Sequence, residues 1–448
     1  MFKTSRKSVK TRFAPSPTGF LHLGGLRTAL YAYVFAKQHK GEFLLRIEDT
    51  DRARYVAEAE KNINETLQTF NLVPDQEPVR QSDRIDVYKK YANELLAKNL
   101  AYEDTGAIRF RMPKTGTTKF SDTIRGEIEI ENKDQEDFVI LKSDGYPTYN
   151  LAHLIDDYEM GITHVIRGEE FIPSMPKYIA LHEALGWQIP EYAHLPLLLN
   201  KNRSKLSKRE GDVAVEDYLK KGYLKEAILN FVALLGWHPS QSEKEIYTLQ
   251  ELILEFKLED VQKAGAIFAL DKLNWFQKVW ITKLSDESKN IANHPFYQIV
   301  KRHLPEASDN FLARLWPHLT ERLTAPENYE KDLDEFSFFV KKPDFEAKLL
   351  VWKKSDKETT GEVLTKLLEF LKQLPDYLWD KEELENNVKN FISENNWDNG
   401  TVLWPLRVAL TGREKSMGPF EIMDILNQTE NRGVVFERIE KAISILTR

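Results

Sequence analysis

The stretch PSPTGFLHLGG, residues 15–25, follows a short strand that we predict over residues 11–14. Its two prolines fix φ at alternate positions and stiffen the connection. Gly24 and Gly25 remove side chains where a segment of helical periodicity begins, so that the first amide groups of the helix can meet phosphate oxygens, aided by the helix dipole. The stretch therefore predicts a strand, a rigid turn and a helix whose N-terminus receives an anion.

A second segment, SKLSKR at residues 204–209, brings Lys205 and Lys208 into a basic run without acidic residues. Alone, such a run is most often a solvated surface loop. Together with the first stretch it predicts a site that activates a substrate with ATP. Attack on the α-phosphate concentrates negative charge that preorganised cations stabilise. Such a displacement needs positioning, metal and charge but no covalent protein intermediate, so a chain without cysteine can perform it.

The composition narrows the class of protein. The chain has 448 residues, a formal net charge of −7 and no cysteine, which predicts two to four domains and excludes disulfides and thiolate metal sites. We find no candidate membrane span and no secretory signal, and a cytosolic location is the simplest interpretation. The acidic total argues against a nucleic-acid partner, but contacts to a phosphate backbone need only local basic patches.

The order of elements predicts an α/β fold. A second buried strand is expected over residues 43–47, two helices should follow, and the later one carries Tyr88, Tyr91, Ala92, Leu95 and Leu96 on one face. This β-α-β opening fits a doubly wound nucleotide-binding sheet, whose ligands lie beyond the carboxyl ends of the strands. Residues 15–25 and 48–51 both fall at such ends.

The pattern of hydrophobic residues changes twice along the rest of the chain. Short alternating strands at residues 108–110, 127–130 and 138–141 predict a small insertion. A strand over 163–166, a helix over 175–185 and a strand over 194–198 then resume the α/β pattern, and from about residue 224 the periodicity is helical. We predict catalytic halves over 1–100 and 141–223, an insertion over 101–140, a helical connecting domain over 224–285 and further helical domains over 286–448.

Five short motifs follow one another along the chain: PSPTGFLHLGG (15–25), RIEDTDR (46–52), LKSDGYPTY (141–149), MGITHVIRGE (160–169) and SKLSKR (204–209). They closely resemble bacterial-type glutamyl-tRNA synthetase, a class I aminoacyl-tRNA synthetase, over most of residues 11–280. A weaker match follows at residues 404–412. The resemblance implies a Rossmann-like catalytic domain with a small α+β insertion that binds the tRNA acceptor stem, followed by helical anticodon-binding domains.

The resemblance also implies roles for individual residues. Those expected to bind glutamate are Arg12, Ala14, Ser16, Glu48, Tyr149, His153 and Arg167. Those expected to bind ATP are Thr18, His22, Gly24, Gly25, Leu197, Leu198, Lys205 and Lys208, of which His22, Lys205 and Lys208 are the catalytic set. Arg407 and Ser416 match positions that approach the anticodon. For any one of these residues considered without its motif, an exposed ion pair or a surface loop is the simpler interpretation.

The sequence departs from the family pattern at three places. His153 stands where asparagine is common, Gly25 replaces the second histidine of the general class I signature, and the insertion is short. Some relatives bind zinc there through cysteines, which this chain lacks, so we expect ATP and Mg²⁺ but no zinc.

The implied activity is that of a glutamate–tRNA ligase, which forms glutamyl-adenylate and transfers glutamate to tRNA(Glu). Use of tRNA(Gln) as well stays open, and we expect a monomer located in the cytoplasm. One alternative is the shorter paralogue that glutamylates a queuosine base, which is disfavoured by the long helical region after the catalytic part. Another is a catalytically silent tRNA-binding paralogue, which is disfavoured because the chemical residues Arg12, His22 and Lys208 are all present.

Overall fold

The computed structural model describes residues 8–204, 206, 214–240, 242–287, 290–323, 325–429 and 432–447. These residues belong to two compact units, Met1–Gln277 and Lys278–Arg448. The division falls within helix α9, which spans Leu270–Glu287. None of the helices in the described ranges combines the length and apolar composition needed to cross a bilayer.

A parallel sheet forms the centre of the first unit. Strands β1 (Lys10–Phe13), β2 (Glu42–Ile47) and β3 (Val79–Arg80) pair in the order β1-β2-β3. Strands β9 (His164–Gly168) and β10 (Glu191–Leu195) pair in parallel, and β1 lies beside β9. The Thr163 amide donates to the Lys10 carbonyl oxygen at 2.9 Å at that junction. This is the predicted doubly wound sheet, and the crevice where its winding reverses lies between β1 and β9.

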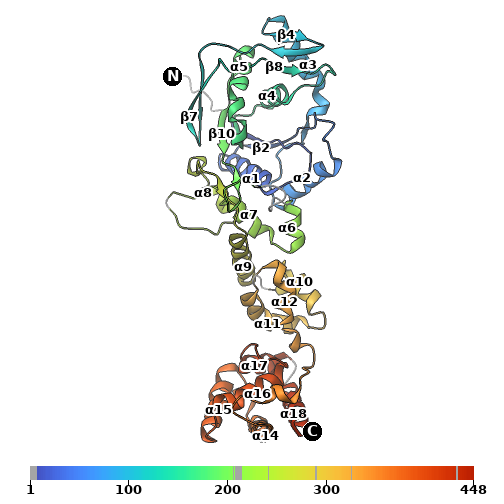
Figure 1. Ribbon diagram of the computed structural model, residues 1–448, viewed down its shortest axis with the longest axis vertical. Helices are drawn as coiled ribbons and strands as arrows, with labels where there is room; N and C mark the ends of the chain where they lie inside the picture. Colours follow the sequence, from blue (N-terminus) through green and yellow to red (C-terminus); the bar gives the residue numbers. More distant parts are fainter. Residues whose placement is uncertain are drawn as a thin grey trace. The chain divides into compact units, whose positions relative to one another are not determined.

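Helices cover this sheet as the apolar periodicity predicts. Helix α1 (Leu23–Gln38) packs against β1, β2 and β9, and Figure 1 shows it next to β2. The other helices of the α/β part are α2 (Ala57–Thr69), α3 (Ile85–Ala97), α4 (Tyr149–Glu159) and α5 (Met175–Leu185). The expected face of α3 is buried at Tyr88, Tyr91, Ala92 and Leu95, while Leu96 is partly buried.

The predicted insertion divides between two sheets. Strands β4 (Ala101–Asp104), β5 (Ala107–Phe110) and β8 (Phe138–Leu141) form an antiparallel sheet against which α3 packs. Strands β6 (Thr117–Asp122) and β7 (Gly126–Glu131) form a hairpin that joins the edge of β10, where Tyr192 pairs with Asp122. The end of β6 is thereby attached to the central sheet.

The strand expected over residues 194–198 is two strands. β10 ends at Leu195, and β11 (Leu198–Leu199) pairs instead with β12 (Ala266–Ile267). Pro196 lies between them and has no N–H to continue a ladder. The first unit then continues through α6 (Val215–Lys221), α7 (Lys225–Ala233) and α8 (Leu249–Glu255).

The second unit is helical, as predicted. Its helices are α10 (Tyr297–His303), α11 (Asp309–Arg322), α12 (Tyr329–Asp334), α13 (Ala347–Leu350), α14 (Lys357–Gln373), α15 (Lys381–Glu394), α16 (Asn399–Thr411), α17 (Pro419–Thr429) and α18 (Gly433–Thr447). Helices α14 to α18 pack together (Figure 1). The side chains of Ser308, Asp356 and Asp380 accept backbone N–H groups at the starts of α11, α14 and α15, which satisfies donors that the helices cannot pair.

Candidate active site

A cleft of about 960 Å³ opens at the carboxyl ends of β1, β2 and β9. It gathers most of the residues that the sequence singles out. The predicted residues that line it are Arg12, Ala14, Ser16, Thr18, His22, Gly24, Gly25, Glu48, Tyr149, Arg167, Leu197 and Leu198. Two segments expected to cooperate, the turn before α1 and the region leading to the SKLSKR run, therefore meet at one cavity.

The N-terminus of α1 forms one end of the cleft. His22 is the N-cap residue of α1, and its Nδ1 accepts the backbone N–H of Gly25 at 3.2 Å. A Cβ atom at Gly25 would lie 2.5 Å from Leu21 Cδ1, so a larger residue here would have to displace the end of the Leu21 side chain. The helix dipole and exposed amide groups of this turn favour an anion such as phosphate.

The predicted lysines Lys205 and Lys208 lie outside the described residues. Leu206, between them in sequence, is described: it is buried, lines the cleft, and its N–H donates to the Leu198 carbonyl oxygen at 2.9 Å. The SKLSKR segment therefore reaches the cleft at Leu206.

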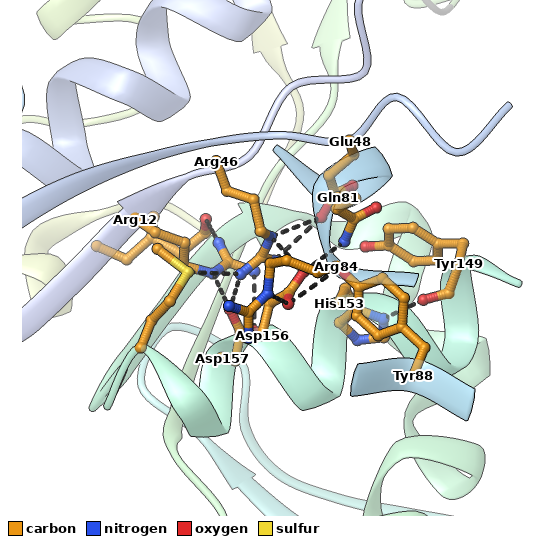
Figure 2. A network of polar contacts seen from close by, with 12 residues as sticks. Arg12, Arg46, Glu48, Gln81, Arg84, Tyr88, Tyr149, His153, Asp156 and Asp157 are labelled. Atoms are coloured by element: carbon orange, nitrogen blue, oxygen red, sulfur yellow. Dashed lines mark hydrogen bonds and ion pairs between the residues drawn. The ribbon is translucent and has the colours of Figure 1, made fainter. Parts of the chain in front are cut away.

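A network of buried charges supports the wall of the cleft (Figure 2). Arg46 is fully buried, and its guanidinium donates to Asp157 Oδ1 at 2.7 Å and to Glu48 Oε1 at 3.0 Å. Although burial opposes its charge, the neighbouring carboxylates of Asp157, Glu48 and Asp156 raise the pKa of Arg46. Asp156 in turn accepts hydrogen bonds from side chains on the other side of the network, those of Gln81, Arg84 and Tyr88. Arg46 is thus neutralised by the protein itself.

Arg12 and Glu48 connect this network to the cleft. Arg12 donates from Nε to Asp157 Oδ1 at 3.0 Å, so part of its guanidinium is already engaged. Burial would raise the pKa of Asp157, but the charges of Arg12 and Arg46 lower it well below its usual range. Glu48 receives both of its bonds from Arg46 on Oε1, and burial raises its pKa. A cationic ligand group at Glu48 would favour its ionised form.

Arg167 differs from Arg12 and Arg46 because no carboxylate pairs with it among the residues that the structure describes. It is 4% exposed, its Nε donates to His194 Nε2 at 3.2 Å, and its Nη1 is buried without a described partner. The rings of Phe171, Tyr178 and Tyr192 surround it at about 5 Å. A buried cation without a counterion is costly, so this side chain is suited to receive a carboxylate ligand.

Tyr149 forms a side wall of the cleft, and His153 lies behind it. The two rings stack at 4.5 Å, and His153 Nδ1–H donates to the Tyr149 carbonyl oxygen. Burial lowers the pKa of His153 well below its ordinary value, so its ring is neutral. His153 does not line the cleft in this structure. Its packing supports Tyr149 from behind.

Sequence reasoning missed several residues that shape the site. Asp156 and Asp157 are buried on α4, the helix that begins at the last residue of the LKSDGYPTY segment. Two adjacent acids within an apolar helix face are a usable signal, because buried carboxylates need cationic partners. The cleft is also lined by Phe171, Glu170 and Lys142, which lie within or beside the quoted motifs.

The two residues expected at the anticodon lie in the second unit. Arg407 is partly buried on α16, and its Nε has no partner among the described residues. Ser416 is partly buried in the connection to α17, and its Oγ donates to the Met417 carbonyl oxygen at 2.9 Å.

Comparisons with known proteins agree with this arrangement. Residues 8–107 and 103–275 match the family described as "tRNA synthetases class I (E and Q), catalytic domain", and residues 295–443 match the "Anticodon binding domain". The fold, the cleft and these matches define a class I tRNA synthetase.

Full-length relatives narrow the class. A glutamate–tRNA ligase of Chlorobium phaeovibrioides is 39% identical, and the match covers 98% of this chain and 95% of the relative. A glutamate–tRNA ligase of Clostridium novyi is 38% identical, and the match covers 98% of this chain and 99% of the relative. The crystal structure of a glutamate tRNA ligase from Elizabethkingia meningosepticum, in complex with its amino acid, superposes with a TM-score of 0.85 at 33% identity over 98% of this chain and 100% of that one. The chain belongs to the glutamate–tRNA ligase family.

Proposed function

We propose that the chain activates L-glutamate with ATP in this cleft and transfers it to the 3′-terminal adenosine of tRNA(Glu). The observation that carries the proposal is Arg167, a buried guanidinium in the cleft wall with no carboxylate partner among the described residues. A substrate with a side-chain carboxylate would supply the missing counterion.

The charged residues of the cleft support one proposed orientation for glutamate. Its side-chain carboxylate binds Arg167, with Arg12 beside it on the neighbouring strand, and its α-ammonium group binds Glu48. Ala14, Ser16 and Tyr149 line the space between these charged groups. This leaves the α-carboxylate for the end of the cleft formed by α1.

ATP binds across the turn that precedes α1. The triphosphate lies against the α1 N-terminus, where Thr18, His22, Gly24 and Gly25 face the cleft, and the adenine lies at Leu197 and Leu198. Mg²⁺ accompanies the β- and γ-phosphates as part of the nucleotide substrate. Lys205 and Lys208 are proposed to bring further positive charge to the phosphates.

Two displacements follow from these placements. An oxygen of the glutamate α-carboxylate attacks the α-phosphorus, the bond to the β-phosphate oxygen breaks, and pyrophosphate leaves. The charge that develops on the phosphate oxygens is stabilised by the α1 N-terminus and the cations around it. The 2′-hydroxyl of the terminal adenosine of the tRNA then attacks the glutamyl carbonyl carbon, loses its proton, and displaces AMP.

The helical unit would select the tRNA. Arg407 and Ser416 are proposed to approach the anticodon, whose unpaired bases are read by stacking and edge contacts. Whether tRNA(Gln) is also charged is part of this proposal to be tested. We also propose that the enzyme acts as a monomer in the cytoplasm.

The test measures both steps on the full chain. Glutamate-dependent ATP–pyrophosphate exchange is followed with and without purified tRNA(Glu), and labelled glutamate is offered with tRNA(Glu) and tRNA(Gln). We expect exchange that requires glutamate and charging of tRNA(Glu). Absence of any glutamate dependence, with or without tRNA, would refute the activity. Charging of tRNA(Gln) distinguishes relaxed from strict tRNA choice.

Lys208→Ala tests the lysine run within the same assay. We expect a sharp drop in adenylation with tRNA binding largely retained, because the lysine acts on the phosphates and not on the tRNA. An unchanged exchange rate would remove Lys208 from the proposed catalytic set.

A further inference from the structure

Three buried side chains form a line behind the cleft, one from each of three neighbouring strands. Asp122 ends β6, His194 lies on β10, and Arg167 lies on β9. His194 and Arg167 are opposite each other in the β9–β10 pairing, and Asp122 pairs with Tyr192, two residues before His194. The side chains of Asp122 and His194 are both 0% exposed, so water cannot replace the contacts between them.

The distances fix the tautomer of His194. Its Nδ1 lies 2.6 Å from Asp122 Oδ2, and an ionised carboxylate can only accept, so Nδ1 carries the hydrogen. Nε2 of His194 then carries no hydrogen, and its lone pair accepts the Nε–H of Arg167 at 3.2 Å. Burial lowers the pKa of His194 although the Asp122 bond opposes this, which keeps the ring neutral.

Asp122 is held in its ionised form by the same surroundings. Burial alone would raise the pKa of Asp122, but the His194 contact and the backbone N–H groups of Arg125 and Ile124 lower it. Its Oδ1 accepts those two amide groups at 2.8 and 3.0 Å. The negative charge of Asp122 therefore reaches Arg167 through one neutral imidazole and does not touch it directly.

This arrangement leaves part of Arg167 for a ligand. Its Nε is used by His194 and its Nη2 by Met175 Sδ, while Nη1 is buried without a described partner. Arg46 shows the contrasting case, because Asp157 and Glu48 contact its guanidinium directly. A direct acidic partner would compete with a substrate carboxylate for Arg167. A neutral imidazole acceptor instead orients the Arg167 guanidinium without balancing its positive charge.

We propose that Asp122 and His194 are positioning residues for the substrate carboxylate: Asp122 selects the His194 tautomer, and His194 orients the Arg167 guanidinium. This inference rests on the proposed function, since it assumes that Arg167 binds the glutamate side chain. It also assigns the tip of the β6–β7 hairpin, part of the insertion, a role in amino-acid binding.

Two isosteric variants of His194 separate positioning from packing. In His194→Gln the side-chain oxygen can stand where Nε2 stood and still accept from Arg167. In His194→Asn the amide nitrogen can stand where Nδ1 stood, which keeps the Asp122 contact but loses the Arg167 acceptor. The readout is the KM for glutamate and the KM for ATP in aminoacylation of tRNA(Glu) by the full chain.

We expect His194→Asn to raise the KM for glutamate roughly tenfold, the worth of one buried hydrogen bond to a charged group. His194→Gln should raise it by no more than about threefold, and the KM for ATP should change less than about twofold in both. A purely structural role predicts the reverse order, because asparagine keeps the contact to the buried Asp122. His182→Asn is the matched control: His182 is a buried histidine on α5 and contacts neither Arg167 nor Asp122 in the described structure, so its KM for glutamate should stay unchanged.

Asp122→Asn tests the tautomer directly. An asparagine amide that donates to Nδ1 moves the imidazole hydrogen to Nε2, which then faces the Nε–H of Arg167, donor against donor. We expect a rise of roughly tenfold in the KM for glutamate, with the thermal melt used to confirm a folded chain. This variant also decides the matter if His194→Asn does not fold.

The outcomes are distinguishable. A wild-type chain without glutamate-dependent activity would refute the proposed function itself. An active wild type whose Asp122→Asn and His194→Asn variants keep the wild-type KM for glutamate would overturn only the positioning role. Equal increases in the KM for glutamate and for ATP, or equal effects of His194→Gln and His194→Asn, would overturn it as well.

Discussion

The two units of the chain bury different kinds of side chain. Among the described residues, the charged side chains buried in the first unit are Arg12, Arg27, Arg46, Glu48, Asp49, Glu60, Asp122, Asp156, Asp157 and Arg167. In the second unit Arg438 is the one buried acidic or basic residue of the described ranges, apart from His294. Both units nevertheless have extensive apolar cores. Among the described residues, buried charge is therefore concentrated in the unit that contains the cleft.

This difference separates two uses of buried charge. Arg46 is neutralised by carboxylates of the protein, while Arg167 has none among the described residues. The first kind supports the walls of the cleft, and removing it leaves carboxylates uncompensated. The second kind is proposed to receive the carboxylate of the substrate, so its removal should act mainly on ligand binding. Variants of the two arginines should therefore fail in opposite ways.

The largest effect on stability is expected for Arg46→Met. The substitution leaves Glu48 and Asp157 buried without this cation, which should lower the free energy of unfolding of the first unit by about 3–5 kcal/mol. Arg438→Met is the control in the second unit, where the guanidinium donates to the carbonyl oxygens of Leu410 and Phe338, and about 1–3 kcal/mol is expected. Urea unfolding followed by hydrogen exchange in each unit measures both. Equal losses would mean that the carboxylates near Arg46 relax into solvent.

The next largest effect is on activity, for Arg167→Met. We expect kcat/KM for glutamate to fall by about two to three orders of magnitude, or roughly 3–4 kcal/mol, because the substrate carboxylate loses its buried partner. The melting temperature should change little, since no protein carboxylate is left unpaired. Steady-state aminoacylation and a thermal melt test this together. A large loss of stability with retained KM for glutamate would place Arg167 among the structural cations with Arg46.

Local sequence was sufficient to predict the frame of the site. β1, the start of α1 and β2 were predicted to within about a residue or two because short apolar runs, two prolines and two glycines mark these boundaries. The cleft-lining positions of His22 and Glu48 follow from these boundaries, since His22 lies just before the predicted helix and Glu48 directly follows the predicted strand over residues 43–47. The helices of the second unit were equally predictable from the sequence, because apolar residues such as Leu364, Leu367 and Leu371 recur at helical spacing and form one buried face.

Long-range pairings were not predictable in this way. No local pattern specifies that Asp122, in an insertion, reaches His194 on a strand of the central sheet, because that contact depends on the register between β6 and β10. The ion pairs of Arg46 with Asp157 join residues far apart in sequence for the same reason. The strand expected over 194–198 was wrong in its continuity because Pro196 interrupts the ladder.

Acidification should weaken the first unit more than the second. Burial lowers the pKa of His182 to about 4 from its ordinary 6.5, so the folded chain stays neutral there while the unfolded chain takes up a proton. Stability is therefore complete above pH 6.5 and is lost as the pH falls toward 4, by about 2 kcal/mol near pH 5 for this group alone.

Other buried groups strengthen this contrast. The pKa values of His153, His164 and His194 are lowered in the same direction in the first unit, and that of His294 in the second. Glu48 opposes the trend, because burial raises its pKa. Hydrogen exchange of both units at about pH 7.5 and pH 5 measures the difference, and His182→Gln should reduce it. Equal weakening of the two units would contradict the contribution of the buried histidines.

The smallest effect tests a backbone feature that the two units share. Gly186 ends α5 with φ +70°, and Gly412 ends α16 with φ +71°. Alanine at either position must adopt the left-handed conformation, at a cost of about 1 kcal/mol. A Cβ at Gly412 would also lie 3.0 Å from the Asp344 carbonyl oxygen, whereas a Cβ at Gly186 would meet no atom within 4 Å among the described residues beyond its own chain neighbours. We therefore expect Gly412→Ala to destabilise its unit by about 2 kcal/mol and Gly186→Ala by about 1 kcal/mol, measured by urea unfolding. Equal losses would mean that the segment at Asp344 moves aside at no cost, so that the helical unit is the more adaptable of the two at this turn.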